Sequence, residues 1–141
     1  MSGAAMRLAV LPPMLVLAAC GSPAPAATPV PPVPRVISLT DADNHRTLHA
    51  SVGDRLTVTL HSTYWQIGGS ANATVVAALG PPTFAPVLTG CVPGQGCGTV
   101  SERFAVRADG STTLSANRTV CGEALRCTPD QQLYSVTILV P

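Results

Sequence analysis

The chain has 141 residues, the length of a single domain, and its eight basic residues, all arginine, nearly balance seven acidic ones to give a net charge of +1. A surface this close to neutral argues against nucleic acid or an anionic membrane surface as a partner, because binding either one needs positive charge. Proline (14) and glycine (12) are abundant, and aromatic residues (4%) are scarce. Many turn residues, together with frequent valine and threonine, favour an all-β domain over a helical one.

The first 19 residues have the pattern of an export signal. Arg7 is their only charged residue, and an apolar run follows from Leu8 to Ala19. This run is too short to cross a hydrocarbon core of about 30 Å as a helix, and the prolines within it would disrupt such a helix. We therefore expect residues 1–19 to be a signal peptide that is removed.

The signal ends in Leu17-Ala18-Ala19-Cys20, which resembles the lipobox of bacterial lipoproteins. The resemblance implies that the Cys20 thiol receives a diacylglyceryl group and that a signal peptidase cuts just before this residue. Two acyl chains hold a protein on a membrane more stably than one chain does. The expected location is the bacterial cell envelope, lipid-anchored to a membrane and facing outward. An ordinary secretory signal with an incidental cysteine is the alternative.

A proline-rich segment follows the cysteine. Six of the residues from 22 to 34 are proline, which rules out a helix or the interior of a sheet. We expect residues 20–34 to be an extended, polyproline-like tether, with simple disorder as the alternative. The remaining residues, 35–141, are predicted to form one domain.

Short runs of alternating apolar and polar residues fill this domain. In the run 55–62, Leu56, Val58 and Leu60 share one face, which is the period of a half-buried strand. We expect strands at 35–40, 46–50, 55–62 (extended by 64–67 beyond a bend), 74–79, 99–108, 111–120 and 133–140. About seven strands in this length predict an immunoglobulin-like β-sandwich.

Some pairings and inward positions also follow from the pattern. The run 46–50 is expected to pair back on the first strand, and Asp109-Gly110 is expected to form a hairpin-type turn. The expected inward side chains in the later strands are Phe104, Val106, Leu114, Ala116, Tyr134, Val136, Ile138 and Val140.

Four cysteines form two Cys-x5-Cys pairs, Cys91 with Cys97 and Cys121 with Cys127. In an exported domain, four cysteines predict two disulfides, for which three pairings exist. The equal spacing favours two local bridges over two bridges between the loops, which stay open as an alternative. A zinc site is the remaining alternative, although its cysteines normally stand closer together in the chain.

No group of residues has the pattern of a catalytic site. The chain contains neither a Gly-x-Ser-x-Gly elbow nor a glycine-rich phosphate loop before a helix. His45 and His49 are four residues apart, a spacing that along a strand separates the rings by about 13 Å. We expect these two residues and His61 to be solvated, and we expect no metal, no cofactor and no enzymatic activity.

Three segments of the domain share their order and motifs with one family. The run 52–60 leads into His61-Ser62-Thr63-Tyr64-Trp65, Gly94-Gln95-Gly96-Cys97-Gly98 precedes the strand through Phe104, and a later loop runs from Arg118 to Glu123. From about Ala50 to Val140 the chain thus resembles the chagasin-like inhibitors of papain-type cysteine peptidases. The resemblance implies an immunoglobulin-like sandwich in which three loops at one end enter the peptidase cleft.

The same resemblance implies a set of partner-contact residues in these loops: Thr63, Tyr64, Trp65, Gly94, Gln95, Gly96, Gly98, Arg118 and Glu123. The chain lacks the family's Asn-Pro in the first loop and its Pro-Trp in the third. The sandwich core is an alternative place for Trp65, because a tryptophan early in such a domain often packs between the sheets. Turn formation is the alternative role for the glycines.

Together these patterns predict a membrane-anchored, exported lipoprotein whose non-catalytic β-sandwich serves as an envelope structural or protein-binding module. Inhibition of a papain-type cysteine peptidase is the more specific alternative, and small-ligand binding is a further one. The expected partners are a membrane, through the lipid on Cys20, and a protein, but no nucleic acid.

Overall fold

The structure is a computed structural model that describes residues 30, 33–87 and 89–141. The expected signal peptide, Cys20 and most of the tether lie outside these residues, so the export signal and the lipid anchor stay predictions. Among the described residues, no helix is long and apolar enough to cross a membrane.

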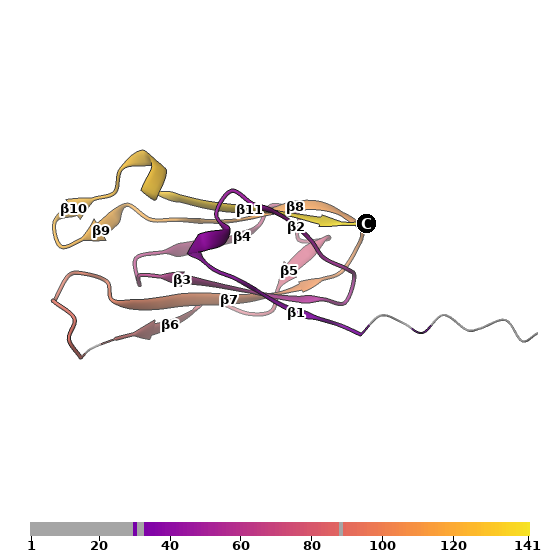
Figure 1. Cartoon of the computed structure of the whole chain (residues 1–141), viewed down its shortest axis with the longest axis horizontal. Helices are drawn as coiled ribbons and strands as arrows, with labels where there is room; N and C mark the ends of the chain where they lie inside the picture. The colour runs from indigo at the N-terminus through magenta and orange to yellow at the C-terminus, as the bar shows by residue number, and fades with distance from the viewer. Residues whose placement is uncertain (1–29, 31–32, 88) are drawn as a thin grey trace, which may run out of the picture. The chain divides into compact units, whose positions relative to one another are not determined.

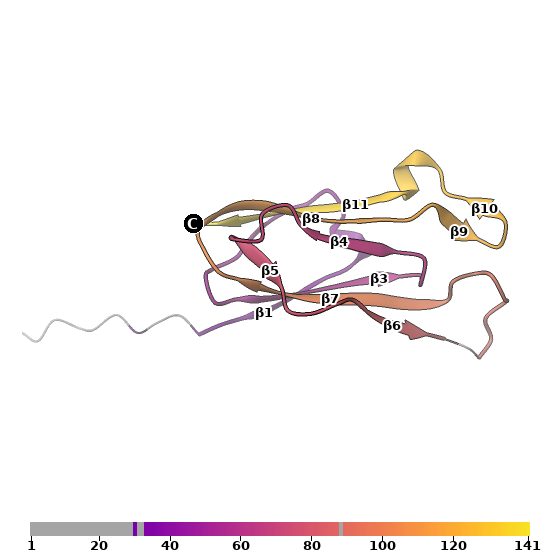
Figure 2. The same ribbon diagram turned by 180° about the vertical axis from the view of Figure 1, so that it is seen from behind.

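Two β-sheets face each other in the domain, and Figures 1 and 2 show them as two layers. The first sheet contains, in order, β1 (Val36–Leu39), β3 (Arg55–His61), β7 (Gly98–Val106) and β5 (Val76–Ala78), with β6 (Thr83–Pro86) also paired to β7. The second contains β2 (Thr47–His49), β11 (Leu133–Val140), β8 (Gly110–Asn117) and β4 (Gln66–Ser70). A separate ribbon consists of β9 (Val120–Gly122) and β10 (Leu125–Arg126), and two short 3-10 turns are η1 (Asp41–Asp43) and η2 (Pro129–Gln131). The predicted all-β sandwich is confirmed.

The core lies between the sheets and follows from the alternation in the long strands. In β3, the three leucine and valine side chains that were expected to share a face are all buried. The antiparallel register of β3 and β7 sets Leu56 opposite Phe104 and Leu60 opposite Val100, so these side chains enter the same layer. The second sheet fills this layer from the other side, and its expected inward residues are buried as well: Leu114, Ala116, Tyr134, Val136, Ile138 and Val140.

Three connections differ from the sequence prediction. β2 does not pair with β1 but lies parallel to β11 in the other sheet. β4 is not an extension of β3, because the chain crosses between the sheets at residues 62–65 and β4 pairs with β8. Asp109-Gly110 is not a hairpin turn, because it joins β7 of the first sheet to β8 of the second. Alternation identifies a half-buried strand, but it does not say which of two facing sheets the strand completes.

Several short strands were not apparent from the sequence. All four residues of β6 are exposed, β9 has three half-buried residues, and β10 has only two residues. A strand that buries neither face has no alternation, and these strands form because their neighbours offer free backbone groups. The described residues therefore contain eleven strands instead of about seven.

Three loops lie together at one end of the sandwich, at the left of Figure 1 and the right of Figure 2. The first loop (62–65) joins β3 to β4, the second loop (87–97, of which 88 is not described) joins β6 to β7, and the third loop (118–132) runs from β8 to β11 through the β9–β10 ribbon and η2. We call this end of the sandwich the loop end. β1 begins, and β11 finishes, at the opposite end.

Candidate functional site

Tyr64 connects the first loop to the second. Its hydroxyl donates a hydrogen bond to the Gly94 carbonyl at 2.5 Å, and the backbone N–H of Thr63 donates to the Gly96 carbonyl at 2.8 Å. Both acceptors lie in the second half of the second loop, so these bonds hold that half against the first loop. Four of the sequence-predicted residues are therefore brought together: Thr63, Tyr64, Gly94 and Gly96.

The glycines of the second loop allow close packing against both neighbouring loops. Gly96 has a φ of +63°, and a Cβ added there would overlap the ring of Tyr64. A Cβ on Gly94 would lie 3.0 Å from the Cβ and Cγ of Glu123, so the second loop also touches the third. Gly98 has a different place, because it begins β7, where a side chain would overlap the backbone of β6. Gly94 and Gly96 thus lie at the contact of the three loops, and Gly98 lies beneath it.

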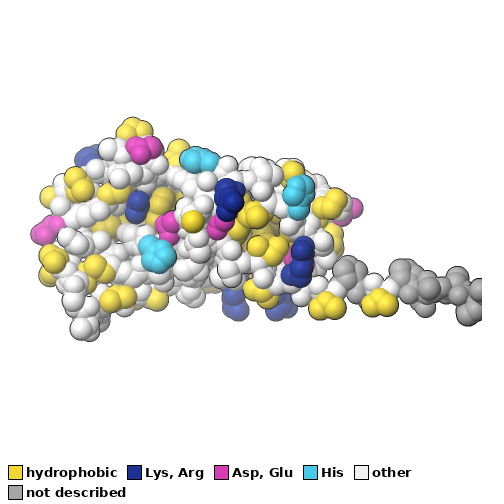
Figure 3. Space-filling view, in the orientation of Figure 1, with side chains coloured by type: hydrophobic (Ala, Val, Ile, Leu, Met, Phe, Trp, Pro, Cys, Tyr) yellow, Lys and Arg dark blue, Asp and Glu magenta, His cyan; other side chains and the backbone are white. Residues whose placement is uncertain are grey.

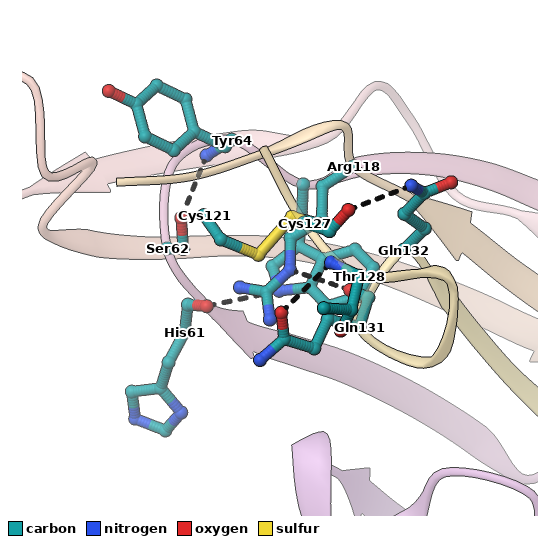
Figure 4. The surroundings of a disulfide bond; sticks show 10 residues. His61, Ser62, Tyr64, Arg118, Cys121, Cys127, Thr128, Gln131 and Gln132 are labelled. Atoms are coloured by element: carbon teal, nitrogen blue, oxygen red, sulfur yellow. Dashed lines mark hydrogen bonds between the residues drawn. A yellow bond between two sulfur atoms is a disulfide. The ribbon is translucent and has the colours of Figure 1, made fainter. Parts of the chain in front are cut away.

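Each of the two longer loops is closed by its own disulfide. Cys91 pairs with Cys97 in the second loop, and Cys121 pairs with Cys127 in the third. The predicted local pairing is confirmed, and both the bridges between loops and the zinc site are wrong, because the local bridges use all four cysteines. Figure 4 shows the second of these disulfides beside Arg118 and Gln132.

Trp65 lies beneath the loop end, not on its surface. It is only 4% exposed, and its indole N–H donates to the His61 carbonyl at 3.0 Å. The guanidinium of Arg118 lies 4.3 Å from the centre of its ring, and Arg118 also donates through Nε to the Gln131 carbonyl at 3.0 Å. The negative potential over an aromatic ring attracts a cation. Arg118 is the first residue of the third loop, so its contact with the Trp65 ring holds the start of this loop in place (Figure 4). Of the residues that the resemblance implied, Trp65 is the one that packs in the core, where it also meets the Tyr134 ring edge-on.

The surface of the loop end is apolar at several exposed positions. Val87, Val92 and Leu125 are each more than half exposed. Gln95, in the same loop as Val92, is exposed as well. A hollow of about 360 Å³ opens between Thr63 of the first loop and the residues of the second. Apolar side chains (yellow) are visible over this end in Figure 3. Sequence reasoning missed Val92 and Leu125, because an isolated apolar residue has no periodicity. Only the structure shows that both side chains are exposed.

Few charges accompany this surface. Glu123, Arg126 and Asp130 are exposed on the third loop, and their signs nearly cancel. On the flank, His61 Nδ1 lies 2.7 Å from Asp41 Oδ2. No group of histidine, cysteine, aspartate or glutamate within the described ranges could hold a metal ion. The described loop end thus exposes apolar side chains and few charged ones.

No protein-family model matches the chain, and no curated protein matches its sequence. A search of solved structures gives matches, two of which follow. The crystal structure of EhICP2, a cysteine protease inhibitor from Entamoeba histolytica, matches 78% of this chain and 99% of its own, with a TM-score of 0.55 and 14% sequence identity. The solution structure of amebosin matches 77% of this chain and 100% of its own, with a TM-score of 0.48 and 16% identity. At this identity the likeness to EhICP2 concerns the fold.

Proposed function

We propose that the domain inhibits papain-type cysteine peptidases by inserting its loop end into the peptidase cleft. The observation that carries the proposal is the convergence of three loops in contact with one another at one end of a sandwich whose fold resembles that of a cysteine protease inhibitor. The comparison favours this function over the envelope structural or protein-binding module, which was the first expectation from the sequence.

The physical state of the loops supports the proposal. Loops that are ordered before binding lose little conformational entropy when they bind, so more of the contact energy remains as affinity. Here two disulfides, two bonds from the first loop to the second and the Arg118–Trp65 stack order the loop end in the free protein. The exposed apolar residues supply area that a cleft can bury.

A titration of the purified protein against papain tests this function. The native protein should inhibit, and Val92→Asp should weaken inhibition at least about 10-fold, because a charge is moved into a desolvated contact. Val52→Asp is the matched control, since Val52 is 49% exposed against 53% for Val92 but lies in the β2–β3 turn at the opposite end. Absence of inhibition at micromolar concentrations, or equal effects of the two variants, would contradict the proposal.

The location is a second part of the proposal. The lipobox-like sequence around Cys20 supports an exported lipoprotein held in a bacterial envelope by lipid. In cells that express the Cys20→Ala variant, the protein should remain an uncleaved precursor without lipid. Labelling with a radioactive fatty acid and the mass of the mature chain measure both effects. Normal processing of the variant would refute the anchor while leaving the inhibition untouched.

A further inference from the structure

The two disulfides of the loop end differ in how they are enclosed. Cys127 is buried, and its backbone N–H donates to the Thr119 carbonyl at 3.0 Å while its carbonyl accepts from Gln132 Nε2 at 3.0 Å. Its partner Cys121 is half-buried. In the second loop both cysteines, Cys91 and Cys97, are half-buried, and both line the hollow of about 360 Å³ between the first and second loops. Solvent and small reagents therefore reach the Cys91–Cys97 bond more easily than the Cys121–Cys127 bond.

The two loops also differ in what would hold them without their disulfides. The third loop contains the β9–β10 ladder and η2, which pair its backbone independently of the bridge. The described part of the second loop contains no ladder, and its own backbone bonds are Gln95 N–H to the Val92 carbonyl at 3.2 Å and Val87 N–H to the Cys97 carbonyl at 3.1 Å. The first loop holds the segment around Gly94 and Gly96 by two further bonds, from the Tyr64 hydroxyl and the Thr63 N–H. The rest of the described second loop has no such support, so it depends on the Cys91–Cys97 bridge more than the third loop depends on its own.

The surroundings of the exposed bridge suit the approach of a thiol. None of the described residues that line the hollow is charged, and they include two glycines, Gly94 and Gly96, whose lack of side chains leaves room beside the sulfur atoms. A thiolate must reach one sulfur atom of a disulfide to exchange with it, so access decides which bridge reacts first.

We propose that Cys91–Cys97 is a thiol–disulfide exchange site at which a dithiol reductant opens the second loop and thereby switches off the binding surface of the loop end. A thiolate of the reductant attacks one sulfur atom, the Cys91–Cys97 bond breaks, and the other cysteine leaves as a thiolate that takes up a proton. The second thiol of the reductant then attacks the mixed disulfide and releases the first cysteine, which is protonated in turn. The reductant ends as a disulfide, and the protein gains two electrons and two protons as two thiols.

The effect on binding rests on the proposed function. Once the bridge is open, the second loop samples many conformations, and ordering it again on binding costs conformational entropy. Reduction of this one bridge should therefore raise the inhibition constant at least about 10-fold. A disulfide that closes a loop lowers the number of conformations open to that loop by about this factor or more.

The test follows both disulfides in the purified full chain during limited treatment with dithiothreitol. Free thiols are trapped with iodoacetamide and located by mass spectrometry. Inhibition is measured in parallel on untrapped samples against papain that has been activated and then freed of reductant. We expect Cys91 and Cys97 to become free first and inhibition to fall in step with them, and we expect reoxidation to restore it.

Two double variants complete the design. Cys121→Ser/Cys127→Ser should lose inhibition on reduction as the native protein does, whereas Cys91→Ser/Cys97→Ser should inhibit weakly from the start and respond little to dithiothreitol. Circular dichroism and the melting temperature show whether each variant is folded, and the reduced native protein serves where one is not. Earlier release of Cys121 and Cys127, or full inhibition with Cys91 and Cys97 reduced, would overturn the proposal. Absence of inhibition by the oxidised protein would refute the proposed function alone, because the order of trapping tests the exchange site independently.

Discussion

Two acidic residues, Asp54 and Glu102, are buried, but their pKa values shift in opposite directions. Asp54 is 2% exposed and accepts hydrogen bonds from Arg35 Nη2 at 2.7 Å, from the Arg35 N–H at 2.9 Å and from the Ser51 N–H at 2.9 Å. The bond from the Arg35 side chain, followed by the backbone bonds, lowers the pKa of Asp54 to about 2 against the opposing effect of burial. This carboxylate thus adds stability above its ordinary pKa, and the addition is lost as the pH falls toward 2.

Glu102 is the opposite case. It is 6% exposed on the inward face of β7, and its Oε2 atom has no hydrogen-bond partner among the described residues. Burial raises the pKa of Glu102, because the charged form is poorly solvated there. Because the pKa of Glu102 is higher in the folded than in the unfolded protein, its neutral carboxyl adds to stability at low pH. This contribution is fully present below the unfolded-state pKa and is lost as the pH rises through the folded-state pKa.

Glu102→Gln should therefore stabilise the protein at pH 7, by about 1 kcal/mol, because the amide keeps the shape and removes the buried charge. The gain should shrink as the pH is lowered toward 4, where the native carboxyl is itself neutral. Urea unfolding of both proteins between pH 4 and pH 8 measures this, with Glu123→Gln, an exposed glutamate, as the control that should change little. A pH-independent difference would mean that the charge of Glu102 is not its cause.

At the scale of loops and strands, the contact between Gly96 and Tyr64 decides the shape of the loop end. Gly96→Ala introduces a Cβ into the Tyr64 ring, so the second loop has to move. Gly90→Ala is a matched control: Gly90 lies in the same loop with a φ of +76°, and a Cβ there meets nothing within 4 Å. Both variants carry the backbone strain of a positive φ, roughly 1 kcal/mol. We expect only Gly96→Ala to weaken papain inhibition, by at least about 10-fold. Equal inhibition by the two variants would show that this contact does not position the loop.

The elements that could be predicted from sequence are those that bury one face. β3, β7, β8 and β11 were located by alternation, because each presents every second side chain to the core. β6 and β10 were not, because their exposed residues carry no period. The sheet that β2 and β4 join could not be predicted either, since it depends on contacts between residues distant in the chain.

The candidate site was predictable to a similar extent. The equal cysteine spacing and the glycine run pointed to the second and third loops, and the resemblance placed Tyr64 and Arg118 among their neighbours. The sequence offered two places for Trp65, and only packing against Tyr134 and Arg118 decides between them. The role of Gly94 beside Glu123 depends on how two loops approach each other, which no local pattern contains.

For the whole domain, the separation of its two ends is the main consequence of the topology. The three loops occupy one end, and β1 begins and β11 finishes at the other (Figures 1 and 2). A fluorophore or fusion partner attached after Pro141 should therefore leave the loop end accessible, which makes that terminus the suitable site of attachment for the binding measurements above.

The parallel pairing of β1 with β3 also has a mechanical meaning. Val36 to Leu39 pair with Arg55 to Val58, so the hydrogen bonds between the strands lie across the long direction of the sandwich. A partner that pulls on the loops while the chain is held before Val36 would load these bonds together, in shear, instead of opening them one after another as in a zipper. The Arg35–Asp54 ion pair at the start of the ladder would carry part of the same load. We therefore expect the pairing of β1 with β3 to resist force along the domain better than a pairing that opens one bond at a time.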